Sequence, residues 1–345
     1  MRCIKAKARS GILLAVVLSL LAGCAGTGGR PRWADGQAKE YPEARFMTAT
    51  GSADSQEKAK DRALSNLAKI FEVQIEESAH DESSAWTQTA GEERKQGNAQ
   101  LAARYLDAYT SKLLEGARIA ESWRDDKAGL YYSLAVLERG PVSNRISSDI
   151  RKQDQQTQAL VGQAQSSGDP LRAARLLFQA RTAQLAREDL QRDLRMVDAS
   201  GLGIRPVWTV QQLDNDIDQQ LKRMKVDVRA LLEPGTGPVP DLGKYLQAGV
   251  AAAGMTPARV DAAYRLEGDL DVQDLGQKDG WYWFRGSLEI ILRDNRNDKL
   301  LVDDRWPLKV SGATKPQAEV RLRDQVQQRL NLELKTTLLG IKEQQ

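Results

Sequence analysis

A stretch of apolar–polar alternation, RVDAAYRLEGDLDV at residues 259–272, constrains the fold more than any other part of the sequence. Its apolar residues recur at every second position and most of the residues between them are charged. These apolar positions are Val260, Ala262, Tyr264, Leu266, Leu270 and Val272. Side chains alternate between the two faces of a strand, so the pattern predicts a strand with one buried and one solvated face. Such strands are typical of antiparallel sheets that carry helices on one side.

The residues that follow supply the rest of this domain. WYWFRGSLEIIL at 281–292 and LLVDDRWPLKV at 300–310 predict two more strands, joined at residues 294–298. A stripe at spacing four then predicts a helix, formed by Leu322, Val326, Leu330, Leu334 and Leu338. We therefore expect an α+β domain over residues 207–340, with Trp306 in its core.

A first α+β domain is predicted over residues 33–140. A strand at 44–49 leads into Gly51 and Ser52, which predict a turn, and a helix begins near Ser55. The apolar face of this helix consists of Ala59, Ala63, Leu67, Ile70 and Phe71. Further along, the patterns predict a strand in FEVQIEES (71–78), a polar excursion (78–97), a helix (98–114) and a hairpin (117–139) with its tip at 125–129.

Residues 141–200 are helical in pattern and are interrupted by SSGDP at 166–170. Glycine ends helices, whereas Asp followed by Pro begins them, so this segment predicts a helical hairpin. The expected fold class is therefore α+β: two small antiparallel-sheet-plus-helix domains joined by a helical hairpin, after a lipoprotein signal peptide.

The first 23 residues predict that signal peptide. Four basic residues precede a short apolar core at 12–21, which is too short to span a bilayer as a mature helix. The core ends in Leu-Ala-Gly-Cys at 21–24, which resembles a bacterial lipobox. In lipoproteins of that kind the cysteine is lipidated and the chain is cut before it. Cys24 is therefore the predicted lipidation site, followed by a tether over residues 24–32.

Lipidation at Cys24 predicts a protein held at a membrane, since two or more acyl chains anchor stably. In lipoproteins of enteric type an Asp after the cysteine retains the protein in the inner membrane. Ala25 stands there and favours the outer membrane, facing the periplasm. Cys3, the other cysteine, would be discarded, so the mature chain would form no disulfide. Loss of residues 1–23 would leave 46 basic residues against 47 acidic ones, which gives no support to nucleic-acid binding.

The sequence offers little for catalysis. Residues 49–55 hold one glycine and no lysine of a phosphate loop, so Gly51 is interpreted as a residue that lets the chain turn beside a neighbouring strand. His80 is the only histidine and lies in the polar excursion, with no partner for a metal or a nucleophile. No catalytic residue, cofactor or metal is predicted.

Two tryptophans are the candidates for partner binding. Trp281 and Trp283 share the polar face of their strand with Arg285, while the other face carries the core residues. Two aromatic side chains on a polar face suit a protein or glycan partner. The alternative is that a loop or the middle helices cover them.

Pro31-Arg32-Trp33, followed by ATGSADSQEKAKDRALSNLAKIFEVQIEE, resembles the LPP20 lipoprotein family over about residues 31–139. Related patterns occur in the amino-terminal part of the flagellar assembly T protein. The resemblance implies a periplasm-facing α+β module for adhesion or scaffolding on the outer membrane, with no established catalytic residues. Four residues match the family as structural positions: Gly51, Ala59, Ala63 and Leu67.

The leading hypothesis is a non-catalytic outer-membrane lipoprotein that binds an envelope protein or glycan. The second is an assembly accessory of a surface machine, such as a flagellum or a secretion pore. The third is a periplasmic enzyme that acts on glycans.

Overall fold

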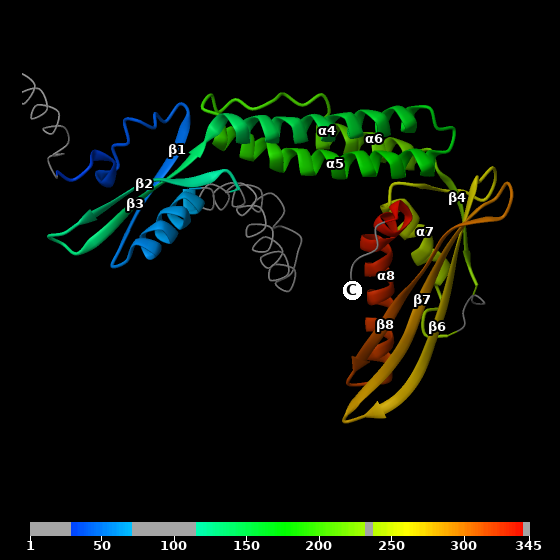
Figure 1. The fold of residues 1–345 in the computed structure, drawn as a ribbon. Coiled ribbons are helices and arrows are strands. Elements are labelled where there is room, and N and C mark those ends of the chain that lie inside the picture. Colours follow the sequence, from blue (N-terminus) through cyan, green and yellow to red (C-terminus); the bar gives the residue numbers. More distant parts are fainter. Residues whose placement is uncertain (1–28, 71–114, 232–236, 341–345) are drawn as a thin grey trace, which may run out of the picture. The chain divides into compact units, whose positions relative to one another are not determined.

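The computed structural model describes residues 29–70, 115–231 and 237–340, which divide into two compact units (Figure 1). The first unit comprises Met1–Ser143 and Met196–Ala199, and the second comprises Asn144–Arg195 and Ser200–Gln345. Cys24, the signal peptide and the predicted elements over residues 71–114, His80 included, lie outside the described residues. Each unit is considered by itself.

Within residues 29–70 and 115–143, the sheet of the first unit has three antiparallel strands in the order β1-β3-β2. They are β1 (Phe46–Ala53), β2 (Ala117–Asp125) and β3 (Leu130–Glu138), and β2 and β3 form the predicted hairpin. The central strand does not alternate, because residues 133–137 are all buried. It is covered on both faces: Leu134 and Val136 pack against Trp33 of the short 3-10 helix η1 (Arg32–Asp35), and a helix lies on the opposite face.

That helix runs over residues 56–70 as far as the structure describes it, and it corrects the prediction for Gly51. Gly51 and Ser52 do not form a turn, because β1 continues through them and pairs Gly51 with Ser133. The chain turns only at residues 54–55. Gly51 has no left-handed backbone conformation; instead, the backbone of the helix lies directly on it. The predicted close approach is right, but the neighbour is a helix and not a strand.

The predicted apolar face of this helix is buried at Ala59, Ala63 and Leu67. Ile70 was expected to join it, but this side chain is exposed, one residue before the end of the described segment. The helix also binds the edge strand β1 by polar contacts. Asn66 donates to the carbonyl oxygen of Thr50 at 2.9 Å, and Arg62 donates to that of Ser52 at 2.6 Å.

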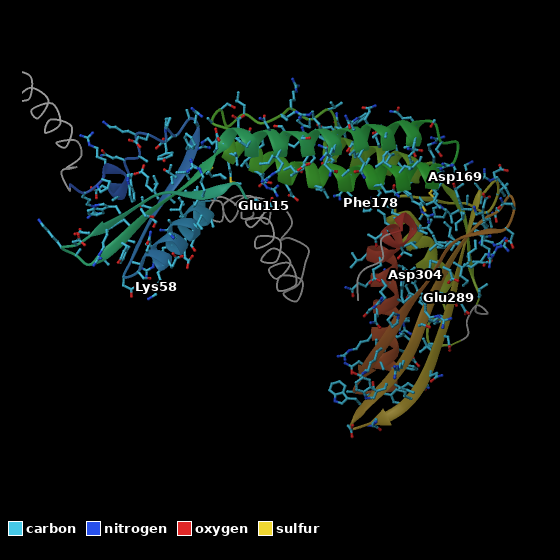
Figure 2. The ribbon with its side chains drawn as sticks, viewed as in Figure 1. Lys58, Glu115, Asp169, Phe178, Glu289 and Asp304 are labelled. Carbon is cyan, nitrogen blue, oxygen red and sulfur yellow. The ribbon has the colours of Figure 1, made fainter. Side chains whose placement is uncertain are left out.

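The helical hairpin is present as helices α4 (Arg139–Gln165) and α5 (Pro170–Val197). Asp169 begins α5 as predicted, because its carboxylate accepts a hydrogen bond from the backbone N–H of Arg172 at 3.0 Å. The same carboxylate accepts from the hydroxyl of Tyr264 at 2.8 Å, which ties the hairpin tip to the second sheet (Asp169 is labelled in Figure 2). Burial and this hydrogen bond raise the pKa of Tyr264 well above its ordinary value.

The second unit contains a five-stranded sheet in the order β5-β4-β6-β7-β8. Three long antiparallel strands correspond to the predicted ones: β6 (Tyr264–Lys278), β7 (Trp281–Asp294) and β8 (Lys299–Gly312). Two short strands, β4 (Lys225–Ala230) and β5 (Thr256–Pro257), add a parallel edge that the sequence analysis did not identify. β4 does alternate, because Val226, Val228 and Ala230 are separated by charged residues, so its sequence indicates a strand; β5, with two residues, is too short to show alternation.

The first five residues of the alternating stretch, 259–263, are not part of the strand. β6 begins at Tyr264, and Val260 is exposed rather than buried. Asp261 has a φ of 56°, a left-handed conformation that interrupts any strand, and one that Asp adopts more readily than most residues. From Tyr264 onward the predicted phase is confirmed, with Tyr264, Leu266 and Leu270 in the core.

Helices complete the second unit, and the α+β fold class is confirmed. They are α6 (Val210–Lys222), α7 (Leu242–Ala252) and α8 (Lys315–Leu339). Helix α8 buries the whole predicted stripe from Leu322 to Leu338 against the sheet, and Trp306 lies in the same core as expected. Residues of α4 and α5, among them Val161 and Leu177, belong to this core too.

Candidate functional site

Strand β7 places the predicted partner-binding residues on the face of the sheet that points away from the core. Trp281 is 45% exposed, Arg285 is exposed and Trp283 is half-buried. The alternate residues Phe284 and Leu288 are buried. Neither indole is therefore part of the core of the second unit.

The neighbouring strands give this face a polar and cationic character. The ammonium group of Lys309 on β8 lies 5.3 Å from the centroid of the Trp283 ring. In the strand register, Arg285 lies opposite Gln273 of β6 and Lys309 of β8. Further along the same face, the carboxylate of Glu289 accepts a hydrogen bond from Arg305 at 3.1 Å (Glu289 is labelled in Figure 2). We name Trp281, Trp283, Arg285 and Lys309 the tryptophan face.

Beside this face, one carboxylate joins the end of the β6–β7 hairpin to helix α8. Asp274 accepts from the hydroxyl of Tyr282 at 2.8 Å and from the ammonium of Lys315 at 2.9 Å. The hydrogen bond from Lys315 is the main cause of a lowered pKa of Asp274, and the bond to Asp274 raises the pKa of Tyr282. All three groups are satisfied by one another, which is typical of a structural contact.

Within the described residues, no three or more His, Cys, Asp or Glu side chains are grouped so that they could hold a metal ion. In the same part of the chain, no helix combines the length and the apolarity that a membrane span requires. His80 and Cys24 lie outside it.

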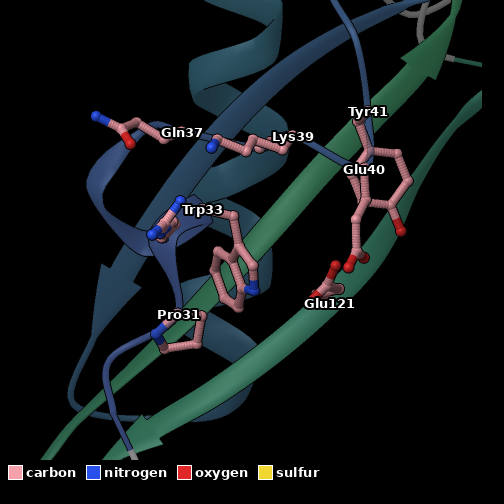
Figure 3. A pocket seen from close by; sticks show the side chains of 9 residues that line it. Pro31, Trp33, Gln37, Lys39, Glu40, Tyr41 and Glu121 are labelled. Carbon is pink, nitrogen blue, oxygen red and sulfur yellow. The ribbon is translucent and has the colours of Figure 1, made fainter.

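The first unit contains a feature that the sequence analysis missed: an open pocket of about 340 Å³ (Figure 3). The segment 31–41 supplies most of the lining, and β2 contributes Glu121. The side chains that carry its chemistry are Arg32, Trp33, Lys39, Glu40, Tyr41 and Glu121. We name these six residues the η1 pocket.

Packing against the sheet positions the segment that lines the pocket. Trp33 is only 7% exposed and packs on Leu134 and Val136. The ring of Tyr41 contacts that of Phe46 edge-on, with centroids 5.4 Å apart. These two anchors fix the backbone of the segment on the sheet, whereas its charged side chains, Arg32, Lys39 and Glu40, are exposed to solvent.

A β-bulge turns Glu121 toward this pocket. Ile119 pairs with Ala135, but Glu121, two residues later, pairs with Leu134, so β2 carries one extra residue at this point. Bulges re-aim side chains and often lie next to functional sites. Glu121 consequently shares a face with Leu134 and Trp33, whereas a regular strand would put it on the same face as Ile119.

Trp33 thus packs the segment 31–41 on one face of the amino-terminal sheet, and the helix over residues 56–70 covers the other face. Residues 31–138 match the LPP20 lipoprotein family. The match confirms the predicted resemblance for this part of the chain. The η1 pocket lies wholly inside the LPP20 domain, and the tryptophan face lies outside it.

Comparison with solved structures gives distant likenesses. A secreted protein of Helicobacter pylori is 12% identical with a TM-score of 0.41, over 86% of this chain and 99% of its own. A minor lipoprotein of Acinetobacter baumannii is 19% identical with a TM-score of 0.27, over 35% of this chain and 94% of its own. No curated protein matches the chain in sequence. At these TM-scores neither structure bears on the function of the chain.

Proposed function

We propose that this protein is a non-catalytic outer-membrane lipoprotein that faces the periplasm and acts as a binding or scaffolding module of the cell envelope. One observation carries the proposal: the lipobox cysteine, Cys24, stands seven residues before the start of the LPP20 match at residue 31. A lipid anchor directly ahead of a domain of a lipoprotein family is the arrangement that a membrane-tethered module requires. Ala25 supports the outer membrane, because it is not the retention residue Asp.

The anchor is tested by Cys24→Ala. This variant should carry no acyl chain and should keep its signal peptide, since the modified cysteine is the residue before which the chain is cut. Metabolic labelling with a radioactive fatty acid and the intact mass of the purified protein measure both effects. We expect complete loss of label and a mass that still includes residues 1–23.

Two further variants serve as controls for the anchor. Cys3→Ala should leave lipidation intact, because Cys3 precedes the cleavage point. Ala25→Asp should keep the label but shift the protein to inner-membrane fractions in a density gradient. Acylated Cys24→Ala protein in outer membranes would overturn the lipoprotein assignment, and an unchanged distribution of Ala25→Asp would overturn the location.

The tryptophan face is our proposed surface for an envelope partner. Trp281 and Trp283 remain in contact with solvent on a face where Arg285 and Lys309 add positive charge. Tryptophan and arginine are enriched among residues that dominate binding energy, often by about 2 kcal/mol or more when truncated. The assembly of a surface machine is a second role that such a face could serve, and the identity of the partner distinguishes the two.

The double variant Trp281→Ala/Trp283→Ala should stay folded and lose its partner. Because both indoles lie off the core, we expect its thermal unfolding midpoint to change by no more than a few degrees. In-cell crosslinking followed by mass spectrometry should show the partner with the native chain and not with the variant. Val320→Ala, which alters an exposed apolar residue on α8, is the matched control. A folded double variant that keeps every partner would remove the tryptophan face from consideration.

A further inference from the structure

The η1 pocket combines charges of both signs that do not neutralise one another. Arg32 and Lys39 are cationic, and Glu40 and Glu121 are anionic. No ion pair joins any of these four side chains to another residue in the described part of the chain. By contrast, Arg30, just before the pocket, pairs with Asp35 at 2.8 Å. Unpaired charges of both signs in one pocket suit a ligand that is itself bipolar.

The charges are separated within the pocket. Figure 3 shows the carboxylates of Glu40 and Glu121 pointing toward one another, while the ammonium of Lys39 lies near Gln37, away from them. Two converging carboxylates favour an ammonium group, which can donate to both. The ammonium of Lys39, away from the two carboxylates, offers a cationic donor for an anion, and Arg32 adds a second cation to the lining.

Trp33 adds a hydrogen-bond donor to the wall of the pocket. Its side chain lines the pocket, and its Nε1 is not among the buried atoms that lack a hydrogen-bond partner in the described part of the chain. Its N–H adds a neutral donor to the charged groups of the pocket. In Figure 3 the nitrogen of Trp33 points into the pocket, toward the side where Glu121 lies.

The proposed lipid anchor limits how far the pocket can lie from a membrane. Pro31 follows Cys24 by seven residues, and a chain of that length spans at most roughly 25 Å when fully extended. Lipid headgroups would therefore be the most concentrated bipolar groups within reach of the pocket.

We propose that the η1 pocket binds the zwitterionic headgroup of an aminophospholipid, a phosphate ester of ethanolamine. Its ammonium group lies between Glu40 and Glu121, beside the indole of Trp33, and its phosphate accepts hydrogen bonds from the cationic side chains of Arg32 and Lys39. The proposal rests on the lipid anchor for the source of the ligand, but the recognition chemistry does not depend on the anchor.

Recognition is tested on the full-length protein in a non-ionic detergent, where no phospholipid competes. Calorimetric titration with glycerophosphoethanolamine should show saturable binding at one site. Glu121→Gln should weaken it at least tenfold, because the ammonium loses one of its two charged acceptors. Glu43→Gln changes a carboxylate two residues after the segment 31–41 that does not line the pocket, and it should bind like the native protein. Glycerophosphocholine should bind at least tenfold more weakly, because its quaternary ammonium has no N–H.

The source of the ligand is tested with the lipidated protein in vesicles. A carbodiimide joins a carboxylate directly to a primary amine and adds no spacer, so coupling is favoured where the two groups are held in contact. In vesicles of phosphatidylethanolamine and phosphatidylglycerol we expect one lipid adduct, mapped to Glu40 or Glu121. Vesicles in which phosphatidylcholine replaces phosphatidylethanolamine should give none.

The outcomes separate the two proposals. Binding of the soluble headgroup without a lipid adduct supports the pocket and overturns the lipid as its source. No headgroup binding, equal binding by Glu121→Gln, or adducts that favour Glu43 would overturn the pocket. Loss of the anchor assignment through Cys24→Ala leaves the titration in detergent unaffected.

Discussion

Replacing Gly51 with alanine should lower the free energy of unfolding of the LPP20 domain by about 3 kcal/mol, near the top of the range for overpacked cores. A Cβ at Gly51 would lie 2.2 Å from the backbone nitrogen of Ala63 and 2.6 Å from the carbonyl oxygen of Ala59. Both atoms belong to the backbone of the helix over residues 56–70, so no side-chain rotation relieves the clash. The helix would have to move away from β1, which would open the contacts of Ala59, Ala63 and Leu67.

Hydrogen exchange is the measurement that locates this effect, because the chain has two compact units that need not unfold together. Protection of the amides of β1 and of residues 56–70 should fall in Gly51→Ala and stay unchanged in the sheet of the second unit. Gly140→Ala is the matched control, since a Cβ there meets no atom within 4 Å and alanine favours the helix. Native protection in Gly51→Ala would show that the helix does not pack on Gly51 as described.

Gly51 also illustrates which structural features can be predicted from the sequence and which cannot. A glycine followed by a serine and a helix is typical of a turn, and the sequence pattern predicts one at Gly51. In the structure the strand pairing with β3 continues through Gly51, and the glycine is required by a helix that crosses over it. The need for a residue without a side chain was predictable from the chain. Which neighbour imposes it was not, because that contact depends on tertiary packing.

The tryptophan face and the η1 pocket also differ in how far the sequence predicts them. The faces of β7 follow from the middle of the strand, where Phe284 and Leu288 alternate with Arg285, Ser287 and Glu289, so the positions of Trp281 and Trp283 were predictable. The η1 pocket joins Glu40 to Glu121, and their pairing depends on a bulge that reverses the alternation of β2 after Ile119. Nothing in the residue types of 117–125 marks that extra residue. The one sequence feature that indicated this pocket was a tryptophan, Trp33, directly after the predicted tether.

The second large effect is expected in the helical hairpin, at a buried ion pair. The guanidinium of Arg187 on α5 is only 1% exposed. Its Nε donates to Asp154 on α4 at 2.7 Å, and another nitrogen donates to the carbonyl oxygen of Ile204 at 2.9 Å. Asp154→Ala leaves this charge buried without its counter-ion, so we expect the free energy of unfolding to fall by about 3–5 kcal/mol. Chemical denaturation followed by circular dichroism measures this loss of helix stability.

A double variant separates the effect of the buried charge on the free energy of unfolding from the effect of lost side-chain packing. Arg187→Met combined with Asp154→Leu removes both ions and retains apolar volume, so it should be more stable than Asp154→Ala alone. Asp149→Ala breaks a largely exposed pair with Lys152 on the same helix, and it should cost less than about 1 kcal/mol. If Asp154→Ala were no more destabilising than Asp149→Ala, the Arg187 charge would have to be solvated in another way. If the double variant were less stable than Asp154→Ala, the guanidinium would hold the hairpin chiefly through its bond to Ile204, because that is the contact the double variant also removes.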